Sequence, residues 1–166
     1  MKIASILPYK ENYSSKNAGA VSLWVSDFMK YSSYKKNITV FGYTNTFKYL
    51  SKNYVNINLK SINSKIYSST KEYSKKLIDH FSNNYFDIIE IHNRPIMVED
   101  FAKNINSKII LYLHNDPKSM KGSKNASEKL YLLEKVDKIV FISEWIKKQF
   151  FNDLNFKDHN KVEVIY

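Results

Sequence analysis

Cysteine is absent from this 166-residue sequence, and glycine and proline occur only three times each. Without cysteine the chain cannot form a disulfide framework, a thiolate metal site or a cysteine nucleophile. Its scattered glycines cannot make a G-x-G-x-x-G turn, which argues against a nicotinamide-dependent dehydrogenase. No apolar run approaches the roughly 20 residues that cross a bilayer, and the start of the sequence lacks the long apolar region of a signal peptide. We therefore expect a cytoplasmic protein.

Lysine, by contrast, is abundant: the formal net charge is +10, and Arg94 is the one arginine among 26 basic residues. A surplus of this size indicates attraction to an anion, such as phosphate groups, an acidic glycan, an anionic membrane face or a nucleic acid. The alternative is a compositional origin, because the bias toward Lys, Asn, Ile and Tyr is typical of an AT-rich coding genome. Composition leaves these alternatives open.

Short apolar runs alternate with amphipathic segments along the whole chain. Strands are expected over residues 2–8, 38–43, 55–59, 87–91, 108–113, 138–142 and 162–165. Helices are expected over residues 20–34, 96–104 and 144–154. A further helix should begin at one of residues 68–70 and end near 83. Another should contain Leu130, Leu133 and Val136 and begin after a cap at Ser123 or Asn125. This alternation favours right-handed βαβ crossovers. We predict one α/β domain over residues 1–166, a Rossmann-like, mostly parallel sheet flanked by helices on both faces, with residues 55–59 near its edge.

Polar residues follow the apolar runs where the predicted strands end. The polar segments are 9–12, 92–94, 114–116 and 143–144. Parallel strands bring their carboxyl ends to one edge of a sheet, and ligands of open α/β sheets bind at that edge. The pattern therefore predicts where chemistry would take place.

Gly19 lies in the turn between the first strand and the first helix. A glycine lets the backbone approach a ligand, and the N–H groups of the helix N-terminus attract an anion such as phosphate. An ordinary glycine turn is the equally weighted alternative.

Two histidines follow predicted strands, His92 and His114. An imidazole in that place can hydrogen-bond a hydroxyl or a phosphate, and Asp116 beside it can orient a sugar hydroxyl or accept a proton. The alternative is a histidine satisfied by backbone with a local turn at Asp116. Arg94 can hold a carboxylate or phosphate in a bidentate fork, or form a structural ion pair. Both histidines can be close in space, but their spacing does not support a metal site, and no metal or other cofactor is expected.

Ser143 and Glu144 begin the last predicted helix. Their default interpretation is a cap and a favourable charge at the helix N-terminus, and no G-x-S-x-G elbow points to a serine hydrolase. Lysines 118, 121 and 124, and the aromatic and basic residues between 47 and 54, suit an anionic membrane or a nucleic acid strand, or simply a solvated surface.

Together these segments resemble the amino-terminal, acceptor-side domain of GT-B fold glycosyltransferases, in particular the retaining enzymes of glycosyltransferase family 4. The segments that carry the resemblance are Asn17-Ala18-Gly19-Ala20 with the Trp24 helix, residues 87–95 (DIIEIHNRP), 110–117 (ILYLHNDP) and 136–145 (VDKIVFISEW). They occur in family order and cover nearly the whole chain. The family's second, nucleotide-sugar-binding domain is absent from these residues, so we expect a fragment of a longer enzyme that is inactive alone.

The resemblance implies a role for each polar segment. His114 would be catalytic, close to the reacting centre of the donor sugar. Donor-binding residues would be Gly19, Ala20, Ser143 and Glu144. Acceptor-binding residues would be Asn17, His92, Asn93, Arg94, Asn115 and Asp116.

The implied reaction is sugar transfer, with retention of configuration, from a nucleotide-sugar to a glycan or lipid-linked acceptor in bacterial surface polysaccharide or glycolipid synthesis. The lysine surplus would suit the inner face of the cytoplasmic membrane, and nucleic acid is then not an expected partner. The alternative is a non-enzymatic, basic α/β module that binds a polyanion such as RNA, with strongly salt-dependent affinity.

Overall fold

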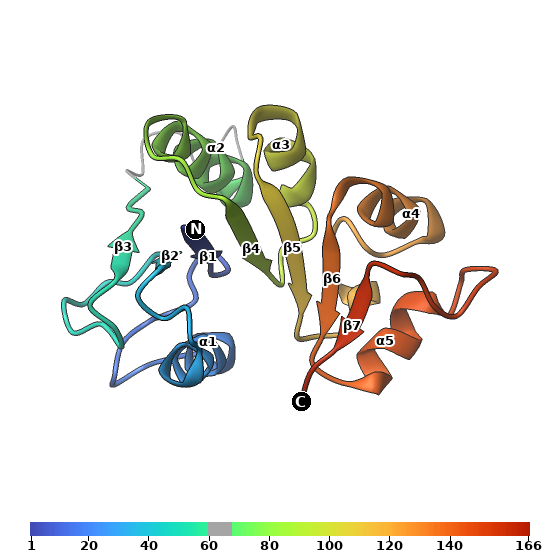
Figure 1. Cartoon of the computed structure of the whole chain (residues 1–166), viewed down its shortest axis with the longest axis horizontal. Helices are drawn as coiled ribbons and strands as arrows, with labels where there is room; N and C mark the ends of the chain where they lie inside the picture. The colour runs from blue at the N-terminus through green and yellow to red at the C-terminus, as the bar shows by residue number, and fades with distance from the viewer. Residues whose placement is uncertain (60–67) are drawn as a thin grey trace. The chain divides into compact units, whose positions relative to one another are not determined.

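The computed structural model describes residues 1–59 and 68–166, in which strands and helices alternate (Figure 1). The strands are β1 (Ile3–Ile6), β2 (Ile38–Gly42), β3 (Tyr54–Asn56), β4 (Ile88–His92), β5 (Lys108–Leu113), β6 (Lys138–Phe141) and β7 (Val162–Val164). The helices are α1 (Ala20–Tyr31), α2 (Ser69–Asn83), α3 (Met97–Asn104), α4 (Ala126–Lys135) and α5 (Glu144–Phe151), with a 3₁₀ turn η1 (Pro117–Ser119). The chain forms two compact units, Met1–Ile89 (unit 1) and Glu90–Tyr166 (unit 2).

Unit 1 has the strand order β3-β2-β1, followed by the start of β4. β1 pairs with β2 and β2 with β3, both in parallel, and the amide of Ile88 donates to the carbonyl of Lys2. Helices α1 and α2 lie on opposite faces of these strands (Figure 1). The edge position expected for the third strand is confirmed.

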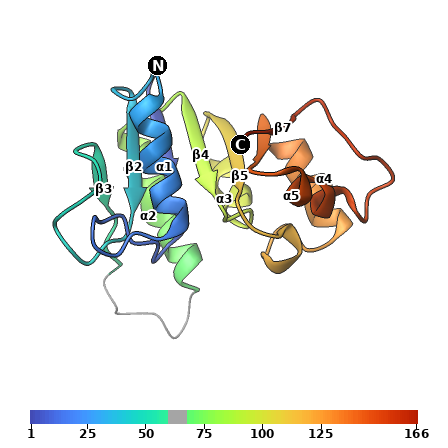
Figure 2. The ribbon, with the colours of Figure 1, turned by 90° about the horizontal axis from the view of Figure 1, so that it is seen from below.

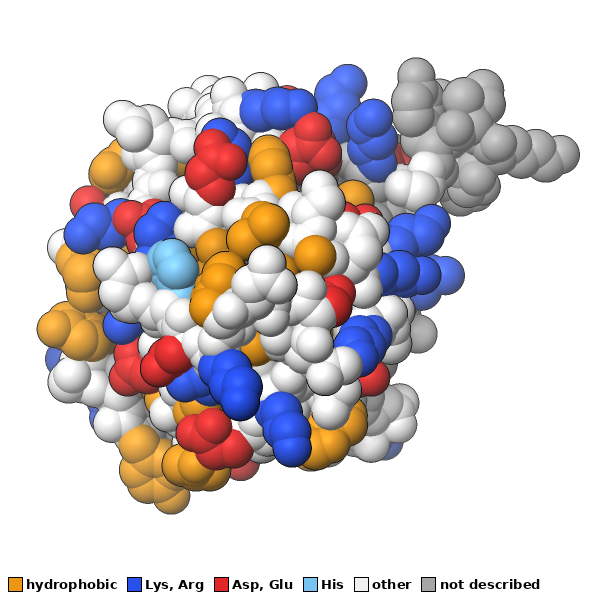
Figure 3. Space-filling view, turned by 90° about the vertical axis from the view of Figure 1, so that its right-hand side faces the viewer, with side chains coloured by type: hydrophobic (Ala, Val, Ile, Leu, Met, Phe, Trp, Pro, Cys, Tyr) orange, Lys and Arg blue, Asp and Glu red, His pale blue; other side chains and the backbone are white. Residues whose placement is uncertain are grey.

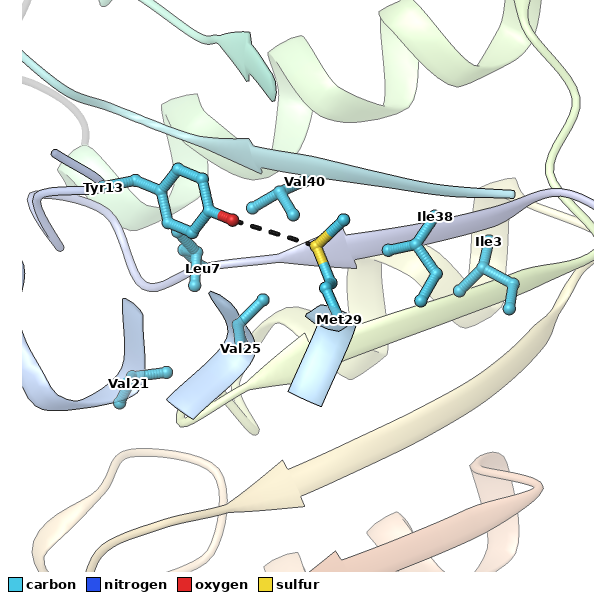
Figure 4. Packing of buried hydrophobic residues seen from close by; sticks show 8 residues of the cluster. All are labelled: Ile3, Leu7, Tyr13, Val21, Val25, Met29, Ile38 and Val40. Atoms are coloured by element: carbon cyan, nitrogen blue, oxygen red, sulfur yellow. Dashed lines mark hydrogen bonds between the residues drawn. The ribbon is translucent and has the colours of Figure 1, made fainter. Parts of the chain in front are cut away.

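One layer of the core of unit 1 lies between α1 and the strands (Figure 4). Val21, Val25 and Met29 follow the helical spacing expected from the sequence and face β1 and β2, where Ile3 and Val40 are buried. Burial of each such side chain contributes about 1.5–3 kcal/mol. This apolar face fixes the helix on the strands, while its N-cap residue, Gly19, contributes no side-chain hydrogen bond.

Unit 2 continues β4 and has the order β4-β5-β6-β7. β6 pairs in parallel with both β5 and β7, and the amide of Asn93 donates to the carbonyl of Tyr112. Helices α3 and α4 pack against each other, and α5 lies on the opposite face of the strands (Figures 1 and 2). Between α4 and the end of α5, the fully buried ammonium of Lys129 forms an ion pair with Asp153 and lies 5.8 Å from the centre of the Phe150 ring.

The predicted fold class, an α/β Rossmann-like domain with a parallel sheet, is confirmed, and so are the caps. The side chains of Ser68, Asn125 and Ser143 accept hydrogen bonds from the first turns of α2, α4 and α5. Helix α1 ends three residues earlier than expected because Ser32 adopts an extended backbone. The loop after His114 contains η1, which the sequence did not predict. None of the described helices has the length and apolar character needed to cross a bilayer.

Candidate functional site

Two histidines meet at the carboxyl ends of β4 and β5 in unit 2. His92 ends β4 and His114 directly follows β5, and Nδ1 of His92 lies 2.9 Å from Nε2 of His114. Their predicted proximity is confirmed. His92 also stacks on Tyr112, with 4.7 Å between ring centres. Only 1 % of the His92 surface and 9 % of the His114 surface are exposed, so the pair forms the inner wall of this edge.

Glu90 extends this pair along β4. Its Oε2 lies 4.0 Å from Nε2 of His92, and the Tyr112 hydroxyl donates to its Oε1 at 3.5 Å. Alternate residues of a strand point to the same face, which is why Glu90 joins His92, and Tyr112 joins His114. Sequence reasoning did not assign Glu90 or Tyr112 to the site. The available signal was a carboxylate inside an otherwise apolar strand, two positions before a histidine.

Burial sets the charge of these side chains. It lowers the pKa of His114 to about 4. It also lowers the pKa of His92 well below its ordinary value, and the neighbouring charge of a protonated His114 adds to that effect. Burial and the Glu90 carboxylate raise the pKa of the Tyr112 hydroxyl. At neutral pH the site therefore contains two neutral imidazoles and a protonated phenol, groups that hydrogen-bond hydroxyls without carrying charge.

Asn93 fixes the backbone beside the histidines. It has a φ of +50°, a left-handed conformation that asparagine tolerates better than most residues. Its side-chain oxygen accepts a hydrogen bond from the His114 amide at 2.7 Å, and its carbonyl accepts one from Arg94 Nη1 at 2.7 Å. The buried Asn93 side chain thus holds the ends of β4 and β5 together. Its predicted role in binding an acceptor stays a prediction, as does that of Arg94.

The remaining predicted residues of unit 2 lie at turns and helix starts. Asn115 is exposed, and the Asp116 carboxylate accepts from the Lys118 amide at 3.0 Å and caps η1. Ser143 Oγ accepts from the Ile146 amide at 3.3 Å, and Glu144 is exposed in the first turn of α5. The structural alternatives named for Asp116 and Ser143, a local turn and a helix cap, are therefore present.

In unit 1, Glu11 lies at the predicted phosphate position. Its Oε1 accepts from the Ser22 amide at 3.3 Å, so its carboxylate caps the first turn of α1. A Cβ added to Gly19 would lie 2.0 Å from the same oxygen, and Gly19 has an ordinary φ of −76°. The clashing atom is the end of the flexible Glu11 side chain, which could move away, so this contact alone does not require a glycine. The approaching group in this structure is the chain's own carboxylate, eight residues earlier in the sequence.

The other predicted residues of this turn, Asn17 and Ala20, are exposed. Their donor and acceptor roles stay predictions. Glu11 was missed by sequence reasoning because the path of residues 9–19 depends on contacts such as the Tyr13 amide with Thr44 Oγ1 at 2.9 Å. No local spacing rule reports such a contact.

Charge on the outer face of unit 2 is mixed. Figure 3 shows basic and acidic side chains interspersed around an apolar area on the face that carries α4 and α5. Lys138 pairs with Glu163, and Lys147 with Asp158, at 2.9 and 3.1 Å. Among residues 1–59 and 68–166, no group of three or more His, Asp or Glu side chains could hold a metal ion.

No family model matches the sequence. A curated protein of Bacillus subtilis strain 168, named "Putative glycosyltransferase YtcC", is 28 % identical over 151 residues, which are 89 % of this chain and 35 % of that protein. The chain therefore spans about a third of that relative.

Solved structures share the fold at low sequence identity. Anabaena Alr3699/HepE in complex with UDP-glucose matches with a TM-score of 0.64 and 13 % identity, over 100 % of this chain and 43 % of that one. Sucrose-phosphate synthase from Thermosynechococcus elongatus matches with a TM-score of 0.67 and 9 % identity, over 99 % of this chain and 48 % of that one. The resemblance to GT-B glycosyltransferases is confirmed for the fold, while the assignment to family 4 stays a prediction.

Proposed function

We propose that this chain is the acceptor-side half of a retaining GT-B glycosyltransferase, which transfers a sugar from a nucleotide-sugar to a glycan or lipid-linked acceptor. The observation that supports this most directly is the neutral His92–His114 pair at the carboxyl ends of two parallel strands. A sugar presents hydroxyl groups, and a neutral imidazole can accept or donate a hydrogen bond to a hydroxyl without the desolvation cost of a charge. The shared fold with a protein that binds UDP-glucose supports a donor of the same chemical class.

The site favours orientation of the donor over proton abstraction. A base whose pKa is about 4 holds little proton affinity at neutral pH, so His114 suits hydrogen bonding better than general base catalysis. The transferred sugar would keep its anomeric configuration, and none of these residues is assigned as the nucleophile. The second wall of the active site would come from a further domain, because a transfer reaction needs both reactants held in place.

The biological setting is part of the same proposal. We place the acceptor in surface polysaccharide or glycolipid synthesis of a bacterium, at the inner face of the cytoplasmic membrane. The net charge of +10 supports attraction to anionic lipid there. A polyanion such as RNA remains the competing partner, and the interspersed charges on the outer face of unit 2 give it no single basic stripe.

The test is transfer by the full-length protein. Nucleotide release and product formation would be measured with UDP-glucose and related nucleotide-sugars, with a bacterial lipid and glycan extract as acceptor. The expected result is acceptor-dependent release and a product that keeps the anomeric configuration, read by NMR. His159→Ala serves as the matched control for His114→Ala, because His159 is a half-buried histidine near the end of the chain. Salt-dependent RNA binding without transfer would overturn the proposal.

A further inference from the structure

The positive charge of this chain is concentrated in unit 1. Residues 1–89 contain 13 lysines and 5 acidic residues, which gives a formal charge of +8. Residues 90–166 contain 13 basic and 11 acidic residues, which gives a formal charge of only +2. An anion attracted by the surplus is therefore expected to meet unit 1.

A surface cavity of about 240 Å³ in unit 1 is lined by three of these lysines, Lys30, Lys35 and Lys52. Lys30 lies in the last turn of α1, Lys35 precedes β2, and Lys52 precedes β3. Because β2 and β3 are parallel, the cavity lies at the edge where these strands begin. It is therefore at the edge opposite to the carboxyl ends of the strands, and it is not part of the candidate site described above.

Two of the three lysines have no acidic partner. Lys30 donates to Oδ1 of Asp27 at 2.7 Å. In the parts of the chain that the structure describes, Lys35 and Lys52 form no ion pair. Positive charges that line one cavity repel each other, and an anion bound between them replaces that repulsion by attraction. Each ammonium group also offers three hydrogen-bond donors and no acceptor, so the rim of the cavity suits an anion with several oxygen atoms.

The floor of the cavity combines carbon atoms with hydroxyl groups. Met29, which is buried, and Leu50 line it, and the Tyr13 hydroxyl donates to Sδ of Met29 at 3.8 Å (Figure 4). Ser26 and Ser51 line it as well. Burial raises the pKa of Tyr13, and the hydroxyls of Ser51 and Ser26 oppose that rise, so the three hydroxyl groups lie close together. A cationic rim over a partly apolar floor suits the ester of a phosphate better than inorganic phosphate.

Both walls of the cavity are fixed by contacts within unit 1. The Val40 amide donates to the carbonyl of Asn53 at 2.9 Å, and the Leu50 amide donates to that of Tyr13 at 3.3 Å. On the other wall, Met29 belongs to the core between α1 and the strands. A site whose backbone is already held in place loses less conformational entropy when a ligand binds.

We propose that this cavity binds the phosphate group of a phosphate ester, with the lysines contacting its oxygen atoms and Met29 contacting its carbon atoms. The cavity is smaller than the roughly 300–1,000 Å³ of sites for drug-sized ligands, which suits a small group of this kind. The phosphate can belong to an anionic lipid headgroup or to a soluble ester. Tyr31 and Tyr34 favour the lipid, because they are 89 % and 52 % exposed beside the cavity's Lys30 and Lys35 in sequence, and tyrosine prefers the membrane–water interface. The inference goes beyond the proposed function, since it involves neither the donor nor the acceptor sugar.

The methyl group of Met29 reports on the cavity directly. Full-length protein labelled with ¹³C-methyl methionine would be titrated with glycerol 3-phosphate, which carries the ester phosphate of a lipid headgroup, and with glycerol as the uncharged control. Met29→Leu assigns the signal. The expected result is a saturable shift of the Met29 methyl signal with glycerol 3-phosphate alone, while Met97 and Met120 of unit 2 keep their positions. Absence of a saturable shift at Met29 would overturn the proposal.

Paired lysine variants test the cause and the source of the phosphate. Lys35→Gln combined with Lys52→Gln removes two cations from the cavity. Lys71→Gln combined with Lys75→Gln is the matched control, because both lysines are exposed on α2, on the opposite face of the strands from α1 (Figure 1). Binding of the full-length proteins to vesicles of phosphatidylglycerol and phosphatidylcholine would be measured by sedimentation. The cavity pair should lower the partition coefficient by roughly 10- to 30-fold, the usual effect of two lysines next to an anionic surface, and the control pair by less than about threefold.

The two measurements together identify the ligand. A Met29 shift that the cavity pair abolishes, together with a selective loss of vesicle binding in that pair, assigns the cavity to a lipid headgroup. The same shift, with vesicle binding lowered equally by both pairs, assigns it to a soluble phosphate ester. A shift that persists in the cavity pair contradicts the role of the lysines and overturns the proposal. None of these outcomes depends on whether the protein transfers a sugar.

Discussion

Unit 2 contains two polar pairs that differ in charge and in accessibility: a buried cation with an exposed partner, and two buried imidazoles. Lys129 is fully buried and its positive charge is paired with Asp153. His92 and His114 are also buried, but both are neutral, and His114 lies at the carboxyl edge of the strands, where a ligand is proposed to bind. A buried charge must be paired at all times, whereas a neutral pair can exchange one of its hydrogen bonds with a ligand. The ion pair is therefore suited to structure and the histidine pair to binding.

The largest expected effect is a loss of enzymatic activity when the histidine pair, and not the ion pair, is changed. His114→Ala in the full-length protein should lower kcat by roughly 10²- to 10³-fold, because the proposed hydrogen bond to the reacting sugar is lost. The free energy of unfolding should change much less than in a variant of the ion pair. Turnover rates measured with UDP-glucose check the effect on activity. Unfolding curves in urea check the effect on stability. Near-normal turnover would show that His114 is only structural.

Changes to the Lys129–Asp153 ion pair should affect the stability of the fold more than its activity. Asp153→Ala leaves the buried Lys129 ammonium without its carboxylate, which should cost about 1–3 kcal/mol of unfolding free energy, less than for a pair buried on both sides because Asp153 is exposed. Lys129→Met replaces the cation with an apolar side chain of similar volume and should cost much less. Equilibrium unfolding in urea measures both. Equal losses in the two variants would mean that the pair's attraction, and not the unpaired charge, dominates.

The free energy of unfolding should also depend on pH through His114. The pKa of His114 is lowered from 6.5 to about 4 in the folded protein, so its neutral form stabilises the fold above pH 6.5. That contribution, at most about 3 kcal/mol, is lost as the pH falls from about 6.5 to 4. Unfolding free energies at several pH values, compared between wild type and His114→Gln, isolate it. Parallel pH profiles for the two proteins would contradict the lowered pKa.

The smallest expected effect concerns Glu11, a carboxylate at the start of α1 that is bound less firmly than either of the two pairs. Its side chain accepts from the Ser22 amide at 3.3 Å, where a donor phosphate is predicted to bind. Glu11→Gln removes the competing negative charge and should tighten nucleotide-sugar binding about 3- to 10-fold, according to the usual strength of charge effects at a helix N-terminus. Calorimetric titration with UDP measures this. Weaker binding would show that Glu11 itself contacts the ligand.

Much of this molecule could be predicted from its sequence because the signals are local. The alternation of apolar runs predicted the strands described above. The starts of three helices were predicted from their N-cap residues, Ser68, Asn125 and Ser143. The proximity of His92 and His114 followed from the rule that parallel strands end at one edge.

The missing parts depend on distant contacts. Nothing near Lys129 in the sequence distinguishes it from the other basic residues, since its burial depends on Asp153, 24 positions later. Glu11 reaches α1 only through the path of an irregular loop. Glu90 lies two positions before His92 in the same strand, so its side of the strand could be predicted, but its contact with Tyr112, 22 positions later, depends on long-range packing. Long-range packing is the information that a single sequence carries least directly.

The separation between Lys129 and Asp153 also bears on the order in which the chain folds during synthesis. Helix α4 emerges from the ribosome before the residue that neutralises its buried ammonium. Until Asp153 has been added, docking of α4 would leave an unpaired cation in the interior, and that cost delays docking. Unit 2 is thus expected to remain open through most of its translation and to close late, after α5 has left the exit tunnel.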